Sequence, residues 1–133
     1  MNILKITTDK RRKGNIGESA VCKYLKKRRY KILCRNYVGD GHEIDIIAEN
    51  KEHICFVEVK SRSEGSKNPY GMRPADAVDR QKRKSIITAA RTFCAANYAN
   101  KKYRFDVAEV FLGEKSEILT VNYLESAFTL DER

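Results

Sequence analysis

The 133-residue chain has few residues suited to zinc binding or to disulfide bonds. It contains four cysteines and two histidines, and no two cysteines are spaced as Cys-x-x-Cys. A structural zinc site needs about four such ligands close together, so the composition argues against a zinc centre. We expect the cysteines to be reduced and mostly buried: Cys22, Cys34, Cys55 and Cys94.

Long apolar runs are also missing. No stretch approaches the roughly 18 to 20 apolar residues that a membrane span requires. The N-terminal sequence MNILKITTDKRRKG places its short apolar part before its charged part, the reverse of a secretory signal. We therefore expect a cytoplasmic protein with no membrane partner. The length suits a single domain over residues 1–133, with a basic N-terminal segment over residues 1–13.

Positive charge, by contrast, is in excess. The formal net charge is +9, and the basic residues cluster at residues 10–13, 26–29 and 80–84. Such clusters attract polyanions and displace the counterions condensed on nucleic acid. A solvated surface would account for a single cluster, and acidic lipids also attract basic segments. Three clusters in one small domain favour a nucleic-acid partner.

The order of the apolar patterns predicts an α/β domain with a mixed central β-sheet flanked by helices. Helical spacing indicates one helix over about residues 15–29 and a longer one over about residues 75–98. Strands are expected near residues 31–38, 43–48, 53–60, 103–111 and 117–121. The polar residues 61–74 contain both prolines, and we expect them to form a mobile surface loop.

Charged residues interrupt the second and third predicted strands, where apolar residues are expected. Burying a carboxylate or an ammonium without a partner is costly, so these charges need an explanation. If the turn between the strands is symmetric, Asp45 pairs with Phe56, and Glu43 lies opposite Glu58. Side-chain alternation then places these three acids and Lys60 on one face of the sheet.

Several carboxylates on one patch repel one another unless a cation lies between them. A hard divalent cation such as Mg²⁺ takes carboxylate and water oxygens, and it can lower the pKa of water and neutralise charge on a phosphate. Lys60 could then hold the attacking water or stabilise the transition state. The pattern favours hydrolysis of a phosphodiester, while a salt-bridged polar sheet face would use the same residues.

Three charged residues outside this hairpin also need an interpretation. Glu18 lies three residues before Val21, which at about 100° per residue puts it at the edge of the helical apolar stripe. It is either a further acid of the site or an acid that interacts favourably with the helix dipole. The apolar face of the second helix, extended backward by one turn from Ile86, leads to Lys82. Asp106 is expected to cap a backbone group or pair with Arg104 rather than join the site.

Asp45 followed by Glu58, Val59 and Lys60 resembles the motif of the PD-(D/E)XK nuclease superfamily. Roughly residues 14–128 are similar to the YraN-like family of small bacterial proteins, an uncharacterised group related to archaeal Holliday-junction resolvases. The matching stretches are GNIGESAVCKYL, YKILCRNY, GHEIDIIA, FVEVKSRS, PADAVDRQKRKSIITAA and RFDVAEV. The resemblance implies a restriction-endonuclease-like core.

The resemblance also implies roles for individual residues. Asp45, Glu58 and Glu18 would bind Mg²⁺ or Mn²⁺, with the backbone carbonyl of Val59 as a further ligand. Lys60 would be the catalytic lysine, and Glu43 is a supporting or alternative acid. The nucleic-acid contacts are assigned to basic and polar residues beside the expected loop: Lys82, Gln81, Arg62, Arg83 and Lys84.

We expect a metal-dependent endonuclease that hydrolyses phosphodiester bonds in DNA. No recognition helix or zinc finger is evident for reading bases, which favours structure-selective over sequence-specific cleavage, on branched, flapped or single-stranded DNA. One alternative is a nucleic-acid-binding module of the same fold with little or no activity. Another is an interaction protein that binds a second protein or acidic lipid. RNA stays open as a substrate, and the resemblance suggests a homodimer.

Overall fold

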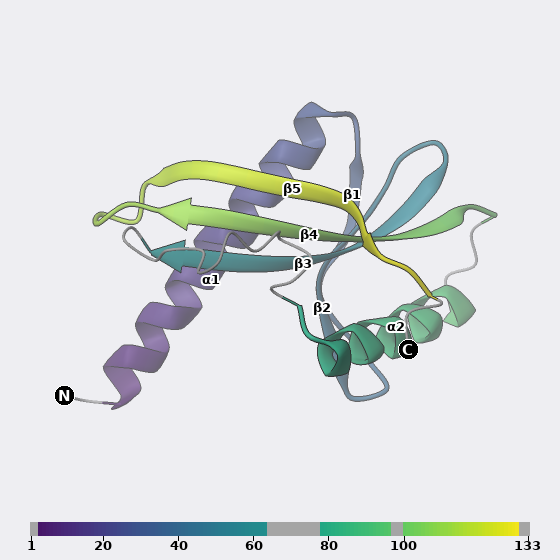
Figure 1. The fold of residues 1–133 in the computed structure, drawn as a ribbon, viewed down its shortest axis with the longest axis horizontal. Helices are drawn as coiled ribbons and strands as arrows, with labels where there is room; N and C mark the ends of the chain where they lie inside the picture. The colour runs from purple at the N-terminus through teal and green to yellow at the C-terminus, as the bar shows by residue number, and fades with distance from the viewer. Residues whose placement is uncertain (1–2, 64–77, 97–99, 131–133) are drawn as a thin grey trace.

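A computed structural model describes residues 3–63, 78–96 and 100–130 of the chain. Figure 1 shows two helices and five strands in this part of the chain. Their order is α1 (Ile3–Lys27), β1 (Lys31–Gly39), β2 (His42–Glu49), β3 (His53–Ser63), α2 (Arg80–Ala96), β4 (Lys102–Leu112) and β5 (Ile118–Phe128). This order and the mixed sheet confirm the predicted α/β class.

The five strands form one sheet in the order β1-β2-β3-β4-β5. Neighbouring strands are antiparallel except β3 and β4, which are parallel. A parallel pair needs a crossover connection, and α2 lies in the segment that joins these two strands. The arrangement is compatible with the restriction-endonuclease-like core that the resemblance implies.

The sheet separates two apolar clusters, each covered by one helix. On the α2 side, Phe56 stacks on Phe105 with ring centroids 5.4 Å apart, and Phe93 of α2 meets Phe56 edge-on. On the other side, Val21 and Leu25 of α1 are fully buried against the sheet. Successive strand residues therefore point alternately to α1 and to α2, which fixes the side of the sheet on which each charged residue emerges.

Several element boundaries differ from the predicted ones. α1 begins at Ile3, so the expected N-terminal segment belongs to this helix from residue 3 onward. β3 continues to Ser63, through the start of the expected loop, while residues 64–74 lie outside the described residues. β5 runs to Phe128, well past the predicted end, because pairing with β4 extends a strand whose mostly exposed residues show little apolar pattern.

The beginning of α2 is fixed by a side-chain cap. The helix starts at Arg80, later than predicted, and the residues expected before and after it at 75–77 and 97–98 lie outside the described residues. The Asp79 carboxylate accepts a 2.8 Å hydrogen bond from the amide of Lys82. An aspartate in this position satisfies a backbone donor that the first turn leaves unpaired.

Two expectations from composition can be compared with the structure. All four cysteines are free; Cys34 is partly exposed and the other three are buried, as predicted. Neither helix in the described part of the chain has the length and apolar character needed to span a membrane.

Candidate active site

The β2–β3 hairpin does not have the symmetric register. Phe56 pairs with Ile47 rather than with Asp45, and the recorded ladder ends where Ile46 faces Val57. The expected pairings of the charged residues across the two strands are therefore wrong. The true register shifts the pairing by two residues, which makes Asp45 the next residue outward from the end of the ladder on β2.

The turn explains this register. The side-chain oxygen of Asn50 accepts hydrogen bonds from the amides of Glu52, at 3.0 Å, and His53, at 2.7 Å. The amide of Asn50 also donates a 3.1 Å bond to the carbonyl of His53. The turn is thus centred on Lys51 and Glu52 rather than on Asn50 and Lys51, because an asparagine side chain can replace a backbone partner in a turn.

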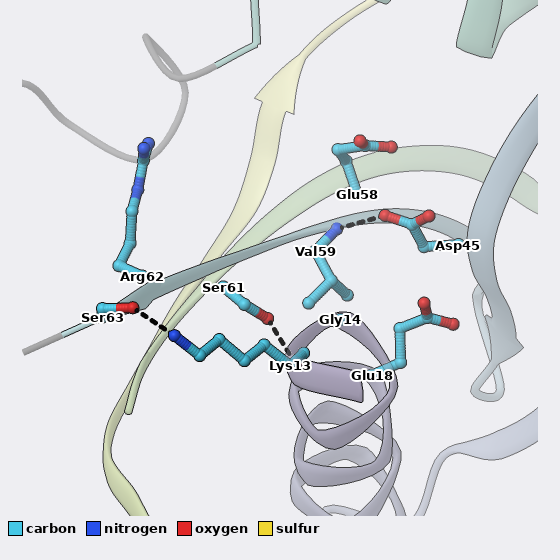
Figure 2. Close-up of a pocket in the computed structure, with 9 residues that line it drawn as sticks. All are labelled: Lys13, Gly14, Glu18, Asp45, Glu58, Val59, Ser61, Arg62 and Ser63. Carbon is cyan, nitrogen blue, oxygen red and sulfur yellow. Dashed lines mark hydrogen bonds between the residues drawn. The ribbon is translucent and has the colours of Figure 1, made fainter. Parts of the chain in front are cut away.

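Beyond the end of the ladder, the side chain of Asp45 takes over as the partner of β3. Its Oδ2 accepts a 2.8 Å hydrogen bond from the amide of Val59 (Figure 2). Glu58, the residue before Val59, places its carboxyl group beside that of Asp45 (Figure 2), close enough for each acid to affect the pKa of the other. The two acids of the motif therefore meet where the β2–β3 pairing ends.

Two lysines flank the carboxylate of Glu58. Glu58 and Lys60 lie on the same side of β3 as Phe56, the side that α2 covers. Glu58 Oε1 is 3.8 Å from Lys60 Nζ and 3.8 Å from Lys82 Nζ on α2. Glu58 is buried, while the side chains of Lys60 and Lys82 are 34% and 39% exposed. The structure thus joins the motif lysine and the predicted helix lysine at one acid.

The third hairpin acid lies elsewhere. Ile44 belongs to the cluster beneath α2 and Ile46 to the cluster beneath α1, although the two residues are only two positions apart. Regular alternation therefore breaks at Asp45, and Glu43 lies close to Glu18 on the α1 side. The expectation that all the hairpin charges share one face is wrong, because β2 is irregular at Asp45.

Glu18 reaches the site because α1 approaches β3 very closely. A Cβ atom on Gly17 would collide with the Oγ of Ser61, so any larger residue would force this hydroxyl out of its hydrogen bond to the Lys13 carbonyl or push the helix away. Glu18 is only 9% exposed, in keeping with its predicted place at the edge of the apolar stripe beside Val21. Figure 2 shows Asp45 between Glu58 above and Glu18 below.

Burial disfavours the charged forms of all three acids, and the Asp45 carboxylate adds repulsion at Glu58 and at Glu18. Burial and then the neighbouring Asp45 carboxylate raise the pKa of Glu58 to about 7, against the opposing effect of Lys82 and Lys60. Burial also raises the pKa of Asp45, although its hydrogen bond from the β3 backbone opposes the shift. The pKa of Glu18 is raised by burial and by Asp45. Burial thus outweighs the neighbouring cations, and a cation bound directly to these acids would favour their ionised forms.

Arg35 and Asn36 of β1 hold the acid of α1 in place, and neither was anticipated from the sequence. Arg35 Nη2 lies 3.8 Å from Glu18 Oε1. With its nitrogen directed toward the acids, the side-chain amide of Asn36 lies 3.0 Å from Glu18 Oε1 and 3.1 Å from Glu43 Oε1. Asn36 has a φ of 52°, a left-handed conformation in which asparagine is enriched. An asparagine inside the expected strand at residues 31–38 was the available clue.

Glu109 is a third residue that was not anticipated from the sequence. It lies on β4 opposite Lys60 and is only 3% exposed. Its Oε2 accepts a 3.2 Å hydrogen bond from Nε of Arg62, one of the predicted nucleic-acid contacts. A charge inside the apolar run VAEVF was the same kind of clue that identified Asp45.

The other predicted nucleic-acid contacts point in different directions from the start of α2. Gln81 and Lys84 are exposed. Arg83 instead turns toward the sheet, where its guanidinium lies 5.4 Å from the ring centroid of Phe128. Among these helix residues the structure brings Lys82 to the acidic pair and places Gln81, Lys84 and Arg83 away from it.

Asp106 does not join the site, and its predicted pairing with Arg104 is confirmed. Arg104 Nη2 donates a 2.9 Å hydrogen bond to Asp106 Oδ2, and both side chains are buried. The hydroxyl of Tyr123 and the amide of Ser126 also donate to this carboxylate. With its partners supplied by β4 and β5, Asp106 fastens the edge strand to the sheet.

The three acids open onto one end of a cavity of about 590 Å³. Its lining residues are Lys13, Gly14, Glu18, Asp45, Glu58, Val59, Ser61, Arg62 and Ser63. Figure 2 shows the acids at one end and the side chains of Lys13 and Ser63 at the other. The cavity therefore joins an acidic end to a hydroxyl-lined end that carries a lysine.

The residues present fit a divalent cation held mainly by two acids. Within the described residues, no three acidic, histidine or cysteine side chains form a ready-made metal cluster. Mg²⁺ keeps several of its waters and often binds through only one or two carboxylates. Asp45 and Glu58, two neighbouring acids whose charged forms burial disfavours, meet that requirement, with Glu18 as a further acid nearby.

Comparison with known proteins gives the chain its family. The model of the uncharacterised protein family UPF0102 matches residues 17–110. The UPF0102 protein of Clostridium acetobutylicum is 41% identical over 118 residues, covering 88% of this chain and 93% of that protein. The UPF0102 proteins of Clostridioides difficile and Caldicellulosiruptor saccharolyticus are 43% and 40% identical, covering 87% and 90% of this chain and 96% and 99% of their own lengths. The chain belongs to the UPF0102 family, the YraN-like family that its motifs resemble.

Proposed function

We propose that this protein is a metal-dependent endonuclease that hydrolyses phosphodiester bonds in DNA. One observation supports the proposal above the others: the carboxyl groups of Asp45 and Glu58 meet where the β2–β3 pairing ends. The Nζ atoms of Lys60 and Lys82 each lie 3.8 Å from Glu58 Oε1. Paired acids beside two cations suit a site that handles a phosphate and a divalent ion together.

In this proposal the acids hold the metal and the lysines serve the phosphate. A bound Mg²⁺ or Mn²⁺ would supply Lewis acidity at the phosphate and lower the pKa of water. Asp45 and Glu58 would be its protein ligands, with Glu18 and the carbonyl of Val59 as further oxygens. Glu58 must lose its proton for this role, and because its pKa is raised to about 7, metal binding should strengthen as the pH rises past that value.

Lys60 is the residue we assign to the reacting atoms. Its ammonium is held beside Glu58, and about one third of its side chain is exposed to the solvent from which substrate and water arrive. It can orient the attacking water or stabilise charge that develops on the phosphate oxygens. Lys82 approaches the same carboxylate from α2, so it is placed to bind a phosphate oxygen of the substrate.

The charge at the start of α2 supports an anionic substrate. The helix opens with the sequence RQKRK and has no acid in its first turn. Cations at a helix N-terminus oppose the helix dipole, so this arrangement lowers helix stability unless an anion is bound nearby. Both helices of the described chain pack against the sheet. The basic residues at the start of α2 suit contacts with backbone phosphates, which favours structure-selective cleavage.

A cleavage assay tests the proposal. Linear, flapped and four-way DNA are incubated with the protein in Mg²⁺, in Mn²⁺ and in EDTA. We expect cleavage only with the metals, lost in Lys60→Ala with DNA binding retained, and kept in Lys115→Ala, a control at an exposed lysine of the β4–β5 turn. DNA binding without cleavage by the wild-type protein would instead indicate a binding module. Equal cleavage by Lys60→Ala would indicate a contaminating nuclease.

A further inference from the structure

The end of the cavity away from the acids contains a lysine with unused hydrogen-bonding capacity. Lys13 lies on α1, and its Nζ donates a 3.1 Å hydrogen bond to the Oγ of Ser63 at the end of β3. Figure 2 shows this side chain extending along the cavity, away from Glu18 and Asp45. Lys13 is partly buried, so its ammonium is fixed near the strand rather than free in solvent.

Lys13 differs from the other cations around the cavity in its partner. Lys60 and Lys82 are paired with Glu58, and Arg62 with Glu109. Within the described residues, Lys13 has a hydroxyl partner and no carboxylate. An ammonium has three donors, so Lys13 can bind at least one further acceptor besides the hydroxyl of Ser63. Its positive charge also lacks a counterion in this part of the chain.

Ser61 and Ser63 arrange this end of the cavity. Both lie on the side of β3 that faces α1, in line with Val59. The hydroxyl of Ser61 donates a 3.2 Å hydrogen bond to the backbone carbonyl of Lys13, which holds the lysine's turn of α1 against the strand. Ser63 accepts from Lys13, which leaves its own O–H group as a donor. A donor hydroxyl beside an ammonium suits a phosphate oxygen.

The distance along β3 indicates which phosphate could bind. Ser63 is four residues beyond Val59, so at about 3.3 Å per residue the two Cα atoms lie roughly 13 Å apart. This separation is too long for contact with the phosphate at the acidic pair. It suits a phosphate further along the same strand, beyond the adjacent one. Figure 2 shows Arg62 directed away from Lys13, so Arg62 is not part of this group.

We infer that Lys13 and Ser63 form a second phosphate-binding subsite, held in place by Ser61. It takes a backbone phosphate of DNA further along the strand from the phosphate at Asp45 and Glu58. The inference rests on the proposed function for the identity of its ligand as DNA. The two ends of the cavity would then bind the same DNA strand: the acidic end cleaves it, and the end with Lys13 positions it.

Binding measurements in EDTA test the subsite without requiring cleavage. Fluorescence anisotropy of a labelled DNA duplex is measured for the wild type, Lys13→Gln, Lys13→Arg and Lys23→Gln over a range of salt concentrations. Lys23 is an exposed lysine of the same helix that lines a different hollow, so it is a control of equal charge change. We expect Lys13→Gln to weaken binding about three- to fivefold near 0.1 M salt. Its slope of log affinity against log salt should fall by about 0.7–0.9.

The two control variants should behave differently from Lys13→Gln. Lys13→Arg should retain most of the wild-type affinity, because the charge remains. Lys23→Gln should keep the wild-type salt slope. Thermal unfolding of each variant shows whether the fold is intact. Equal affinities and equal salt slopes for Lys13→Gln and Lys23→Gln would overturn the inference.

A neutral linkage in the DNA locates the contact. A series of duplexes is prepared, and each duplex carries a single methylphosphonate at a different position. The affinity of each duplex is measured for the wild type and for Lys13→Gln. One position should weaken wild-type binding and leave Lys13→Gln unaffected; no such position would overturn the subsite. If this position is found but Mg²⁺ produces no cleavage in the separate assay, the proposed enzymatic function fails while the subsite stands.

Discussion

The amide of Val59 donates a 2.8 Å hydrogen bond to Oδ2 of Asp45, and this bond lies where the β2–β3 pairing ends. A side-chain carboxylate thus occupies the place of a backbone acceptor in the ladder. The position of Asp45 is therefore set by the main chain of the next strand. The neighbouring residue on that strand, Glu58, is brought into contact with it for the same reason.

Asp45→Asn separates the structural role of this residue from its charge. The amide oxygen of asparagine can still accept the bond from Val59, so the free energy of unfolding should change by less than about 1 kcal/mol. Loss of the negative charge should reduce metal-dependent DNA cleavage by about 100-fold or more. Thermal unfolding and initial cleavage rates measure the two effects. A variant that cleaves at nearly the wild-type rate would remove Asp45 from the proposed metal ligands.

The raised pKa of Glu58 makes stability depend on pH. Burial and Asp45 raise its pKa to about 7 from the usual 4.5, so the folded protein holds this proton more tightly than the unfolded chain does. The stability contributed by the bound proton is complete below pH 4.5 and is lost as the pH rises to about 7. Glu58→Gln should therefore be more stable than the wild type at pH 8, with an upper limit on the order of 3 kcal/mol.

Urea unfolding at pH 4.5 and pH 8, with divalent cations removed by EDTA, checks this prediction. The gain in stability from Glu58→Gln should shrink markedly at the lower pH. At that pH the side chain at position 58 is largely neutral in the folded wild type, as it is in the variant. Mn²⁺ at pH 8 should stabilise the wild type and have much less effect on Glu58→Gln. A Glu58→Gln variant less stable than the wild type at pH 8 would contradict the conclusion that burial disfavours the charged form of Glu58.

Gly17→Ala tests the crossing of α1 over β3. The new Cβ atom would collide with Ser61 Oγ, so either this hydroxyl turns away and loses its hydrogen bond to the Lys13 carbonyl or the helix moves away from the strand. We expect a loss of about 1–3 kcal/mol in the free energy of unfolding. Cleavage should fall as well, since Glu18 follows Gly17. Chemical unfolding and cleavage rates provide the measurements.

Gly14→Ala is the matched control for this variant. A Cβ atom there would meet nothing within 4 Å. The same change should be neutral or stabilise the helix by up to about 1 kcal/mol. In a Ser61→Ala background the cost of Gly17→Ala should shrink, because the colliding oxygen is gone. Equal costs at the two glycines would show that the close approach does not constrain the helix.

Asn36→Gly tests whether Asn36 positions Glu18. Glycine keeps the left-handed conformation at φ 52° without strain but removes the amide between Glu18 and Glu43. We expect the rate constant for cleavage to fall about tenfold, the affinity for DNA to stay near that of the wild type, and unfolding to change little. Single-turnover rates and anisotropy distinguish these effects. Unchanged single-turnover rates would leave Asn36 with no role in the site.

Much of the fold could be predicted because its patterns are local. The stripe of Val21 and Leu25 on α1 and that of Ile86 and Phe93 on α2 repeat at helical spacing, and the structure buries both. Asp45, Glu58 and Lys60 were found because charges interrupt apolar strands. That argument depends only on the order of residues within one element.

The arrangement of the site could not be predicted from such patterns. The register of the hairpin depends on the side chain of Asn50, whose acceptor shifts the turn by one residue. The break in alternation at Asp45 depends on how two separate helices cover β2. Lys13 lines the cavity because α1 begins at Ile3 and runs past β3, whereas the predicted helix began only near residue 15. Each of these depends on contacts between residues far apart in the sequence.

The central claim is that Asp45 and Glu58 together bind a divalent cation. Anomalous diffraction from a crystal soaked in Mn²⁺ at pH 8 tests it most directly, with Asp45→Asn crystals treated in the same way. We predict a manganese peak at the wild-type pair, within about 2.0–2.3 Å of an oxygen of each carboxylate, and its loss in the variant. The account would be contradicted by a wild-type crystal in which Asp45 and Glu58 are well ordered beside each other and no manganese peak lies next to them.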